Sequence, residues 1–181
     1  MRILNAKPFA ALLCAASLAA LAYSMDPLVL RSPAFAANAP IPARFSCDGD
    51  NASPPLQWSD LPPRTVSLAL ILSDPDAPHG TFFHWLIWNL PPQGADGLPP
   101  AQDPQPRLAN GAVQGTNDFR RLGYGGPCPP PGPAHHYVFT LYALDAKLAL
   151  PAGATHGELE AAMRGHVLAT ARLVGTFARG Q

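Results

Sequence analysis

The stretch DPDAPHGTFFHWLIWNL, residues 74–90, determines how the rest of the sequence is interpreted. One apolar run, residues 66–72, stops just before it, and a second apolar run occupies residues 82–90. Pro75 and Pro78 fix φ and lack a backbone donor, so the segment between the runs cannot continue a strand or start a helix. We therefore expect two central strands joined by a rigid, acidic loop.

This loop brings several polar side chains close to the two strands. Asp74 and Asp76 precede His79, and His84 follows two residues into the second apolar run. Both predicted strands are apolar on both faces, which is typical of strands in the centre of a sheet. The polar side chains are therefore expected at one end of a buried sheet.

A later stretch, GYGGPCPPPGPAHHYVFTLYALD, residues 123–145, contains the third predicted central strand at residues 137–144. Side chains alternate between the two faces of a strand, so His135 and Tyr137 point to one face and His136 points to the other. The histidine that can act together with Tyr137 is therefore His135.

The remaining elements are predicted to be short strands, long loops and one helix. Short strands are expected at residues 28–30, 41–45, 56–58 and 112–114, a helix at 155–170, and a closing strand at 171–177. Thr155 and Glu158 match a capping box at the start of the helix. His166 follows the apolar face of this helix and is expected to pack in the core, and Gly175 is expected to form a bulge. Strands dominate, which predicts a β-sandwich with a minor helical part.

Composition sets limits on the class of protein. Charged residues make up 13% of the 181 residues and the formal net charge is zero, so no strong field attracts nucleic acid or an anionic membrane. The chain contains 23 prolines and 15 glycines, but 48% of its residues are hydrophobic. This combination favours one loop-rich β domain with a sizeable core over a disordered chain.

The N-terminal segment resembles a secretory signal peptide. Arg2 and Lys7 precede an apolar, uncharged segment at residues 9–22, which is short for a membrane span. The alternative is an uncleaved N-terminal anchor. Cleavage after Ser24 and cleavage after Ala36 both fit the local sequence.

Either cleavage removes Cys14 and leaves Cys47 and Cys128 as the two cysteines of the mature chain. An even pair in an exported protein is most simply a disulfide, and the alternative is a pair of buried free thiols.

The candidate site combines residues from the two stretches. If the three central strands are neighbours, one end of the sheet gathers the side chains of Asp74, Asp76, His84, His135 and Tyr137. The glycine-rich and proline-rich loop before His135 could aim backbone N–H groups at an anion. Imidazole and tyrosine donors beside a carboxylate suit a phosphate monoester or a zwitterionic head group.

Three other interpretations of these residues stay open at this point. In the first, Asp74 and Asp76 cap their own turn and the histidines pack in the core. In the second, two histidines and a carboxylate bind a metal, although no H-x-H or H-E-x-x-H spacing is present. In the third the protein is a hydrolase, although it has no G-x-S-x-G motif. We expect no metal and no cofactor.

The two stretches together resemble the phosphatidylethanolamine-binding protein family. Two motifs carry the resemblance: DPDAP with the following HW, and GYGGPCPPPG ending in HHYVFTLYALD. The bacterial Raf-kinase-inhibitor-like branch of the family is similar to this chain in three further segments, SPAF at residues 32–35, IPARFSCDGDNASPPLQW at 41–58 and NDF at 117–119. The resemblance implies a β-sandwich of a large and a small sheet with Greek-key connections and one or two peripheral helices. It extends from about residue 28 to residue 177.

The resemblance also implies roles for particular residues. The pocket side chains would be Asp74, His84, His135 and Tyr137, the wall would be Pro78 with the loop from Gly126 to Pro130, and Asp76 would support the turn. The family often has arginine and lysine where this chain has His136 and Pro131, so ligand affinity and partner contacts can differ.

SPAF belongs to the folded domain in such proteins, which favours cleavage after Ser24. We therefore expect a signal peptide at residues 1–24, a single domain at 25–181, and a periplasmic or secreted protein without stable membrane insertion after cleavage. The implied function is non-catalytic binding of a small phosphorylated or anionic ligand. Inhibition or modulation of a protein partner, such as a protease or a kinase, is the alternative, and hydrolysis is a weaker one.

Overall fold

The computed structural model describes residues 27–92 and 97–179, so the expected signal peptide lies outside the described residues. The strands are β1 (Val29–Arg31), β2 (Gln57–Ser59), β3 (Ser67–Asp74), β4 (Phe82–Leu90), β5 (Val113–Gln114), β6 (His135–Leu144) and β7 (Val167–Phe177); the helices are α1 (His156–Met163) and a 3-10 turn (Ala43–Phe45). None of the described helices is long and apolar enough to cross a membrane.

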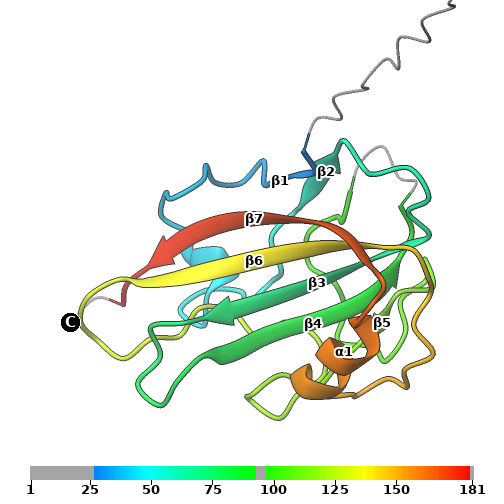
Figure 1. The fold of residues 1–181 in the computed structure, drawn as a ribbon. Helices are drawn as coiled ribbons and strands as arrows, with labels where there is room; N and C mark the ends of the chain where they lie inside the picture. The colour runs from blue at the N-terminus through cyan, green and yellow to red at the C-terminus, as the bar shows by residue number, and fades with distance from the viewer. Residues whose placement is uncertain (1–26, 93–96, 180–181) are drawn as a thin grey trace, which may run out of the picture.

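The strands form a large and a small antiparallel sheet (Figure 1). In the large sheet the order is β5-β4-β3-β6-β7, and β1 pairs with β2 in the small sheet. Strands β3, β4 and β5 are consecutive neighbours, and β6 then returns to lie on the other side of β3. This arrangement is a Greek key, and it places β3 between β4 and β6. The predicted mainly β fold with two sheets is therefore confirmed.

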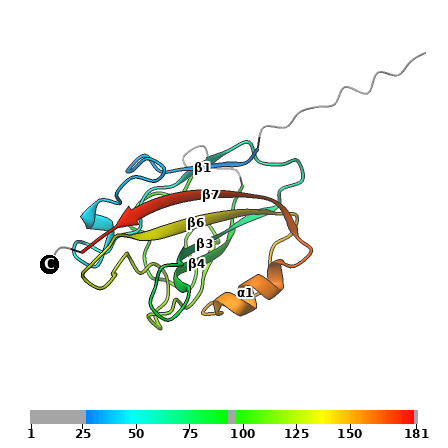
Figure 2. The same cartoon turned by 60° about the vertical axis from the view of Figure 1, so that its left-hand side comes forward.

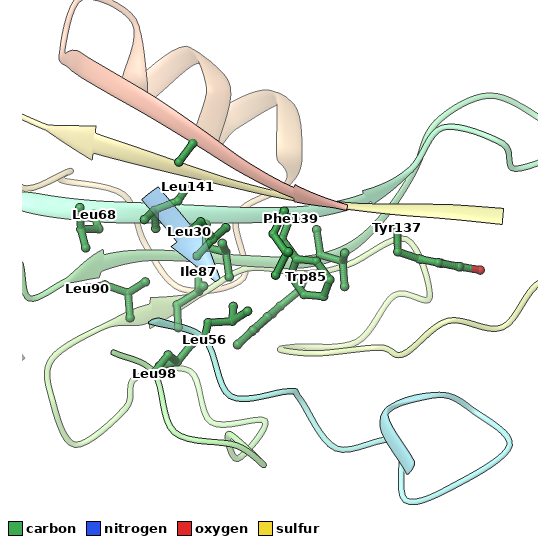
Figure 3. Packing of buried hydrophobic residues seen from close by; sticks show 14 of the residues in the cluster. Leu30, Leu56, Leu68, Trp85, Ile87, Leu90, Leu98, Tyr137, Phe139 and Leu141 are labelled. Atoms are coloured by element: carbon green, nitrogen blue, oxygen red, sulfur yellow. The ribbon is translucent and has the colours of Figure 1, made fainter. Parts of the chain in front are cut away.

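Each face of the large sheet packs against a different layer. Leu68, Leu70 and Leu72 of β3 face a core shared with β1 and the N-terminal segments. Figure 3 shows Leu68 and Leu30 in this core. Ala69 and Ile71 face a second core that includes residues of α1. Figure 2 shows β1 and α1 on opposite sides of the sheet. The continuous apolar pattern of β3 follows from this burial on both faces.

The three central strands form where the apolar runs predict them. Strand β4 has the predicted bounds, β3 extends to Asp74, and β6 begins at His135. Asp74 and His135 are therefore terminal residues of paired strands and are not loop residues. The prediction of a strand at residues 41–45 was wrong, because the chain there forms the 3-10 turn.

The predicted helix was correct at its start and wrong at its end. The capping box is present, and the backbone N–H of Thr155 donates to the carboxylate of Glu158 at 2.8 Å. Helix α1 ends at Met163, and Gly165 follows with a φ of +80°. This left-handed conformation suits glycine and interrupts the helical path. From Val167 onward the chain pairs with β6, so sheet pairing overrides the local helical spacing.

Two single-residue predictions in this region were also wrong. The side chain of His166 is 45% exposed and its Nδ1 lies 2.8 Å from the Asp145 carboxylate, so it does not pack in the core. Gly175 pairs regularly with Tyr137 and forms no bulge. A Cβ at Gly175 would lie 2.5 Å from the side chain of Ile41, so glycine is required there for close packing of neighbouring segments.

Candidate ligand-binding site

A cavity of about 500 Å³ opens where β3 ends and where β4 and β6 begin. Its lining is formed by Asp74, Ala77, Pro78, His79, Gly80, Thr81, Phe82, His84, Asp118, Phe119, Cys128, Pro129, Pro130 and His135. Asp74 pairs with Phe82 across β3 and β4, and the neighbouring Ser73 pairs with Val138 of β6. The strand register thus brings Asp74, His84 and His135 from three strands to one opening.

Asp74 and His135 form the central pair of the site. The Asp74 side chain is buried, and its Oδ2 accepts a hydrogen bond from Nδ1 of His135 at 2.8 Å. Its Oδ1 accepts the backbone N–H of Asp76 at 2.9 Å. An ionised carboxylate only accepts hydrogen bonds, so the Nδ1 of His135 carries a hydrogen. Asp74 therefore both caps the loop and orients the imidazole of His135 at the cavity.

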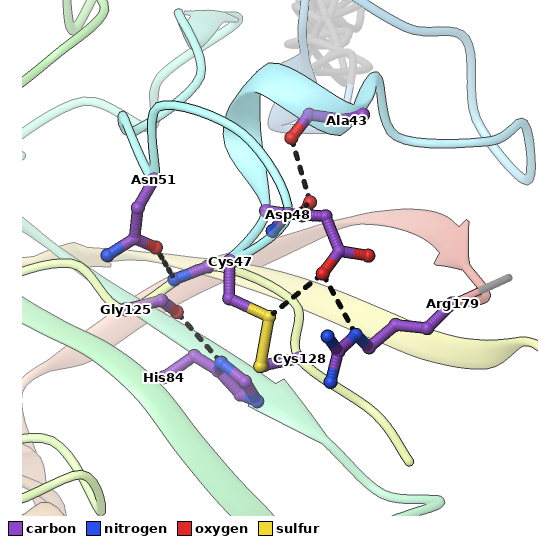
Figure 4. The surroundings of a disulfide bond; sticks show 10 residues. Ala43, Cys47, Asp48, Asn51, His84, Gly125, Cys128 and Arg179 are labelled. Atoms are coloured by element: carbon purple, nitrogen blue, oxygen red, sulfur yellow. Dashed lines mark hydrogen bonds and ion pairs between the residues drawn. A yellow bond between two sulfur atoms is a disulfide. The ribbon is translucent and has the colours of Figure 1, made fainter. Parts of the chain in front are cut away.

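His84 is held by two hydrogen bonds to a single residue. Its Nδ1 lies 2.8 Å from the carbonyl oxygen of Gly125, and the N–H of Gly125 donates to the carbonyl of His84 at 2.9 Å (Figure 4). A carbonyl cannot donate, so Nδ1 of His84 carries the hydrogen. Burial lowers the pKa of His84, and the Gly125 carbonyl opposes this shift only in part. Near neutral pH the ring is therefore neutral, with Nε2 as an acceptor.

His136 lies on the opposite face of β6 from His135, as side-chain alternation predicts. Its backbone N–H and its Nδ1 lie 2.8 and 2.7 Å from Oδ2 of Asp76. The backbone N–H of His136 and then its side chain lower the pKa of Asp76. Asp76 therefore fastens the acidic loop to β6 outside the cavity.

Tyr137 lies beside the cavity and is not part of its lining. The ring is fully buried and meets the His84 ring edge-to-face at 5.2 Å. Its hydroxyl is buried and makes no hydrogen bond to the described residues, and Figure 3 shows it at one end of the core cluster. Burial raises the pKa of Tyr137, and the charge of Asp74 raises it further. The hydroxyl therefore stays protonated across the physiological pH range.

The glycine-rich loop forms the cavity wall differently from the prediction. Pro78 and Pro130 line the cavity, but Gly126 does not. The N–H of Gly126 donates to Oδ1 of Asn51 at 2.7 Å, so it is not available to an anion. A Cβ at Gly126 would lie 2.3 Å from the carbonyl oxygen of Phe45. Glycine is required here because the loop packs closely against the N-terminal segment.

A disulfide joins the cavity wall to that same segment. Cys47 and Cys128 are bonded, with Cα atoms 5.4 Å apart, as the cysteine count predicts (Figure 4). Cys128 lines the cavity, and the N–H of Cys47 donates to the carbonyl of Pro127 at 3.0 Å. The wall is therefore held both covalently and by backbone hydrogen bonds.

Sequence reasoning did not assign Phe82, Asp118 and Phe119 to the site. The Phe119 ring is 39% exposed and meets the rings of Phe82 and His84 edge-to-face, at 4.7 and 5.3 Å. Oδ2 of Asp118 accepts the N–H of Phe83 at 2.7 Å. The NDF triplet at residues 117–119 was the sequence feature from which Asp118 and Phe119 could have been assigned to the site. In the described part of the chain, no group of three His, Cys, Asp or Glu side chains is placed to hold a metal ion.

The fold and the cavity define a Greek-key β protein with a small cavity of mixed polar and apolar lining at one end of its large sheet. The phosphatidylethanolamine-binding protein family model matches residues 31–178, so the chain belongs to this family.

Individual relatives agree with this assignment. A UPF0098 protein from Methanothermobacter thermautotrophicus is 49% identical over 151 residues, covering 83% of this chain and 99% of that protein. A Mycobacterium tuberculosis protein that carries the name lipoprotein LppC is 45% identical over 156 residues, covering 84% of this chain and 73% of that protein.

Solved structures show the same fold. The structure of Escherichia coli YbcL, described as a new member of the mammalian family, superposes with a TM-score of 0.78 at 30% identity, covering 85% of this chain and 99% of that one. A Chlamydia trachomatis structure, described as a homologue of the family, gives a TM-score of 0.77 at 40% identity, covering 84% and 98%.

Proposed function

We propose that the protein is an exported, non-catalytic binding protein for small phosphorylated or otherwise anionic head groups. The observation that carries the proposal is the convergence of His84 and the Asp74–His135 pair on one cavity of about 500 Å³. A cavity of this size accepts one small ligand and offers it a few oriented polar groups.

Export is supported by three independent features. The N-terminal pattern is that of a signal peptide, and disulfides persist mainly in oxidising compartments. The described structure contains the Cys47–Cys128 disulfide. A relative with 45% identity carries a lipoprotein name, which is an exported class.

The absence of turnover is supported by the protonation of Tyr137 and by the disulfide. Tyr137 has a raised pKa and Cys128 is bonded to Cys47, so neither supplies a reactive anion. We expect no hydrolysis of simple phosphate or carboxylate esters above background in a chromogenic ester assay. Activity that disappears in a folded His135→Ala variant would contradict this part of the proposal.

Binding is tested by a matched pair of variants. Phosphate or phosphoethanolamine should bind with a Kd of about 0.1–1 mM, because one head group forms few charge-assisted hydrogen bonds. His135→Ala should weaken binding at least about tenfold, since it removes the histidine that Asp74 orients at the cavity. His136→Ala should leave binding largely unchanged, since His136 points to the other face of β6. Calorimetry or NMR titration measures both, and loss in His136→Ala with retention in His135→Ala would refute the assigned site.

A further inference from the structure

The charges around the cavity are unusual for an anion site. Among the described residues that line the cavity there is no lysine or arginine, but there are two aspartates, Asp74 and Asp118. His79, His84 and His135 are the lining residues that can become cationic. A doubly charged anion would therefore meet the buried carboxylate of Asp74 without a permanent cation to balance it, which is costly. The exposed carboxylate of Asp118 adds a weaker repulsion that solvent screens.

The hydrogen-bonding groups of the cavity also include several acceptors. His84 uses its Nδ1 hydrogen on Gly125, so the neutral ring presents its Nε2 lone pair. Asp118 uses Oδ2 to accept from Phe83, which leaves Oδ1 as a further acceptor. The N–H groups of Gly125 and Gly126 donate to His84 and Asn51 and do not serve as anion donors.

Among the lining side chains that are not exposed, His135 is the main hydrogen-bond donor, whereas His79 and Thr81 belong to the exposed part of the lining. The Nδ1–H of His135 donates to Asp74, so Nε2 donates to a ligand only when the ring is an imidazolium. Tyr137 has a protonated hydroxyl, but this group is buried beside the cavity and is not in its lining. A ligand that both accepts from His135 and donates to Nε2 of His84 matches this arrangement better than one that only accepts.

We infer that the cavity selects oxyanions that carry a proton, namely the singly protonated form of a phosphate monoester or phosphonate, whose P–OH donates to Nε2 of His84. This inference rests on the proposed function of the same site. It excludes tight binding of sulfate, which has no proton to donate near neutral pH. It also excludes phosphodiester head groups, whereas a monoester has a second pKa near 6 and is partly protonated there.

The selectivity is tested with four small ligands at pH 6 and constant ionic strength. Inorganic phosphate and phosphoethanolamine should bind at least about tenfold more tightly than sulfate and glycerophosphoethanolamine in calorimetric titrations. The comparison with glycerophosphoethanolamine, which is a phosphodiester, distinguishes a lipid head group from a free phosphate monoester as the source of the phosphate that the cavity binds. Equal affinity for sulfate or the diester would overturn the inference alone, and no binding of any of the four would overturn the proposed function as well.

A second measurement locates the proton. Monofluorophosphate has a lower second pKa than inorganic phosphate, and methylphosphonate has a higher one. Because His135 donates to the ligand only as an imidazolium, loss of its proton sets an upper limit on the pH of decline for every ligand. If the ligand also carries a proton, monofluorophosphate should lose affinity at a lower pH than inorganic phosphate and methylphosphonate. A common pH of decline for all three would show that a histidine of the cavity alone carries the required proton, and it would overturn the inference.

Asp118→Asn is the variant that tests the inference with least disturbance to the fold. The asparagine oxygen can still accept from the N–H of Phe83, but the negative charge is removed and an NH₂ donor is added. The ratio of phosphate affinity to sulfate affinity should fall several-fold, mainly because sulfate binds better. His136→Ala, outside the cavity, should retain the wild-type ratio. An unchanged ratio in Asp118→Asn together with measurable sulfate binding by the wild type would contradict the inferred selectivity.

Discussion

The imidazole ring of His84 contacts both the hydrophobic core and the lining of the candidate site. Its Nδ1–H holds the loop at Gly125, while its edge-to-face contacts meet Tyr137 on the core side and Phe119 on the exposed side. Protonating this ring would place a charge among groups that favour the neutral form. The stability of the whole domain is therefore linked to the titration of His84.

This linkage gives a prediction with a definite sign. The folded-state pKa of His84 lies below its ordinary value of 6.5, so between the two values the unfolded chain binds more protons than the folded chain. Acidification from pH 7 to pH 5 should therefore lower the free energy of unfolding, by at most about 1.4 kcal/mol per pH unit from this group. Urea unfolding at several pH values should show a shallower dependence in His84→Gln than in the wild type.

The control for this experiment is His166→Gln, because the His166 ring is half-exposed and belongs to a surface pair with Asp145. Its pH dependence should stay close to that of the wild type, since exposed ion pairs contribute little to stability. Identical slopes for His84→Gln and the wild type would show that His84 does not titrate with folding.

At the residue scale, the sequence predicts contacts that depend on strand alternation and does not predict contacts that depend on loop paths. The opposite orientations of His135 and His136 follow from a period of two. The position of Phe119 depends on a turn in which Asn117 donates to Gly123 at 2.9 Å and Arg120 has a positive φ of 61°. No periodicity in the sequence encodes that turn, so the aromatic part of the site was missed.

At the scale of elements, the apolar pattern of the sequence predicts the bounds of strands well and predicts the ends of helices poorly. Strand β4 was predicted with its observed bounds because it is apolar apart from His84 and Asn89. The end of α1 was misplaced because Leu159 and Met163 share a helical face whose spacing continues into Val167. Gly165 was the available signal for the boundary, but only the pairing of β7 with β6 decides that the chain changes structure there.

Two glycine-to-alanine variants separate close packing from ordinary helix propensity. Gly126→Ala should destabilise the protein by about 1–3 kcal/mol, because its Cβ would lie 2.3 Å from the Phe45 carbonyl oxygen and 2.9 Å from Cα of Ser46. Gly157 lies in the first turn of α1, and a Cβ there meets nothing within 4 Å. Gly157→Ala should therefore be neutral or stabilising by up to about 1 kcal/mol.

Chemical denaturation of the two variants measures this contrast. Gly126→Ala should also weaken phosphate binding, because Cys128 and Pro130 of the same loop line the cavity. Similar stabilities for the two variants would indicate that the loop moves away from Phe45 at little cost.

At the scale of the whole molecule, the site lies where the large sheet meets the loop before β6 and the N-terminal segment that supports this loop. The large sheet supplies Asp74, His84 and His135, and the loop before β6 supplies the wall. That wall rests on the 3-10 turn and the segment after it, through Phe45, Asn51 and the disulfide. The hydrophobic periodicity of the sequence predicted that the sheet supplies these three side chains. Only the even number of cysteines predicted the contact between the wall and the N-terminal segment.

The disulfide is therefore expected to contribute to both stability and the cavity. Cys47 and Cys128 are 81 residues apart, so the bridge restricts a long loop of the unfolded chain. The double variant Cys47→Ser, Cys128→Ser should lose about 2–5 kcal/mol of unfolding free energy, mostly by this entropic effect. Phosphate affinity should fall as well, since Cys128 lies in the wall.

Intact mass and thiol alkylation of the unreduced protein test the premise, and denaturation with and without a reductant tests the consequence. If the bridge acts as proposed, the wild type under reducing conditions should approach the stability of the double variant, while the double variant should not respond to the reductant. Alkylation of both cysteines in the denatured, unreduced protein would show that the bridge is absent. A reduced wild type that keeps its stability but loses phosphate affinity would show instead that the disulfide mainly shapes the cavity, because the hydrogen bond from Gly126 to Asn51 then suffices to hold the loop.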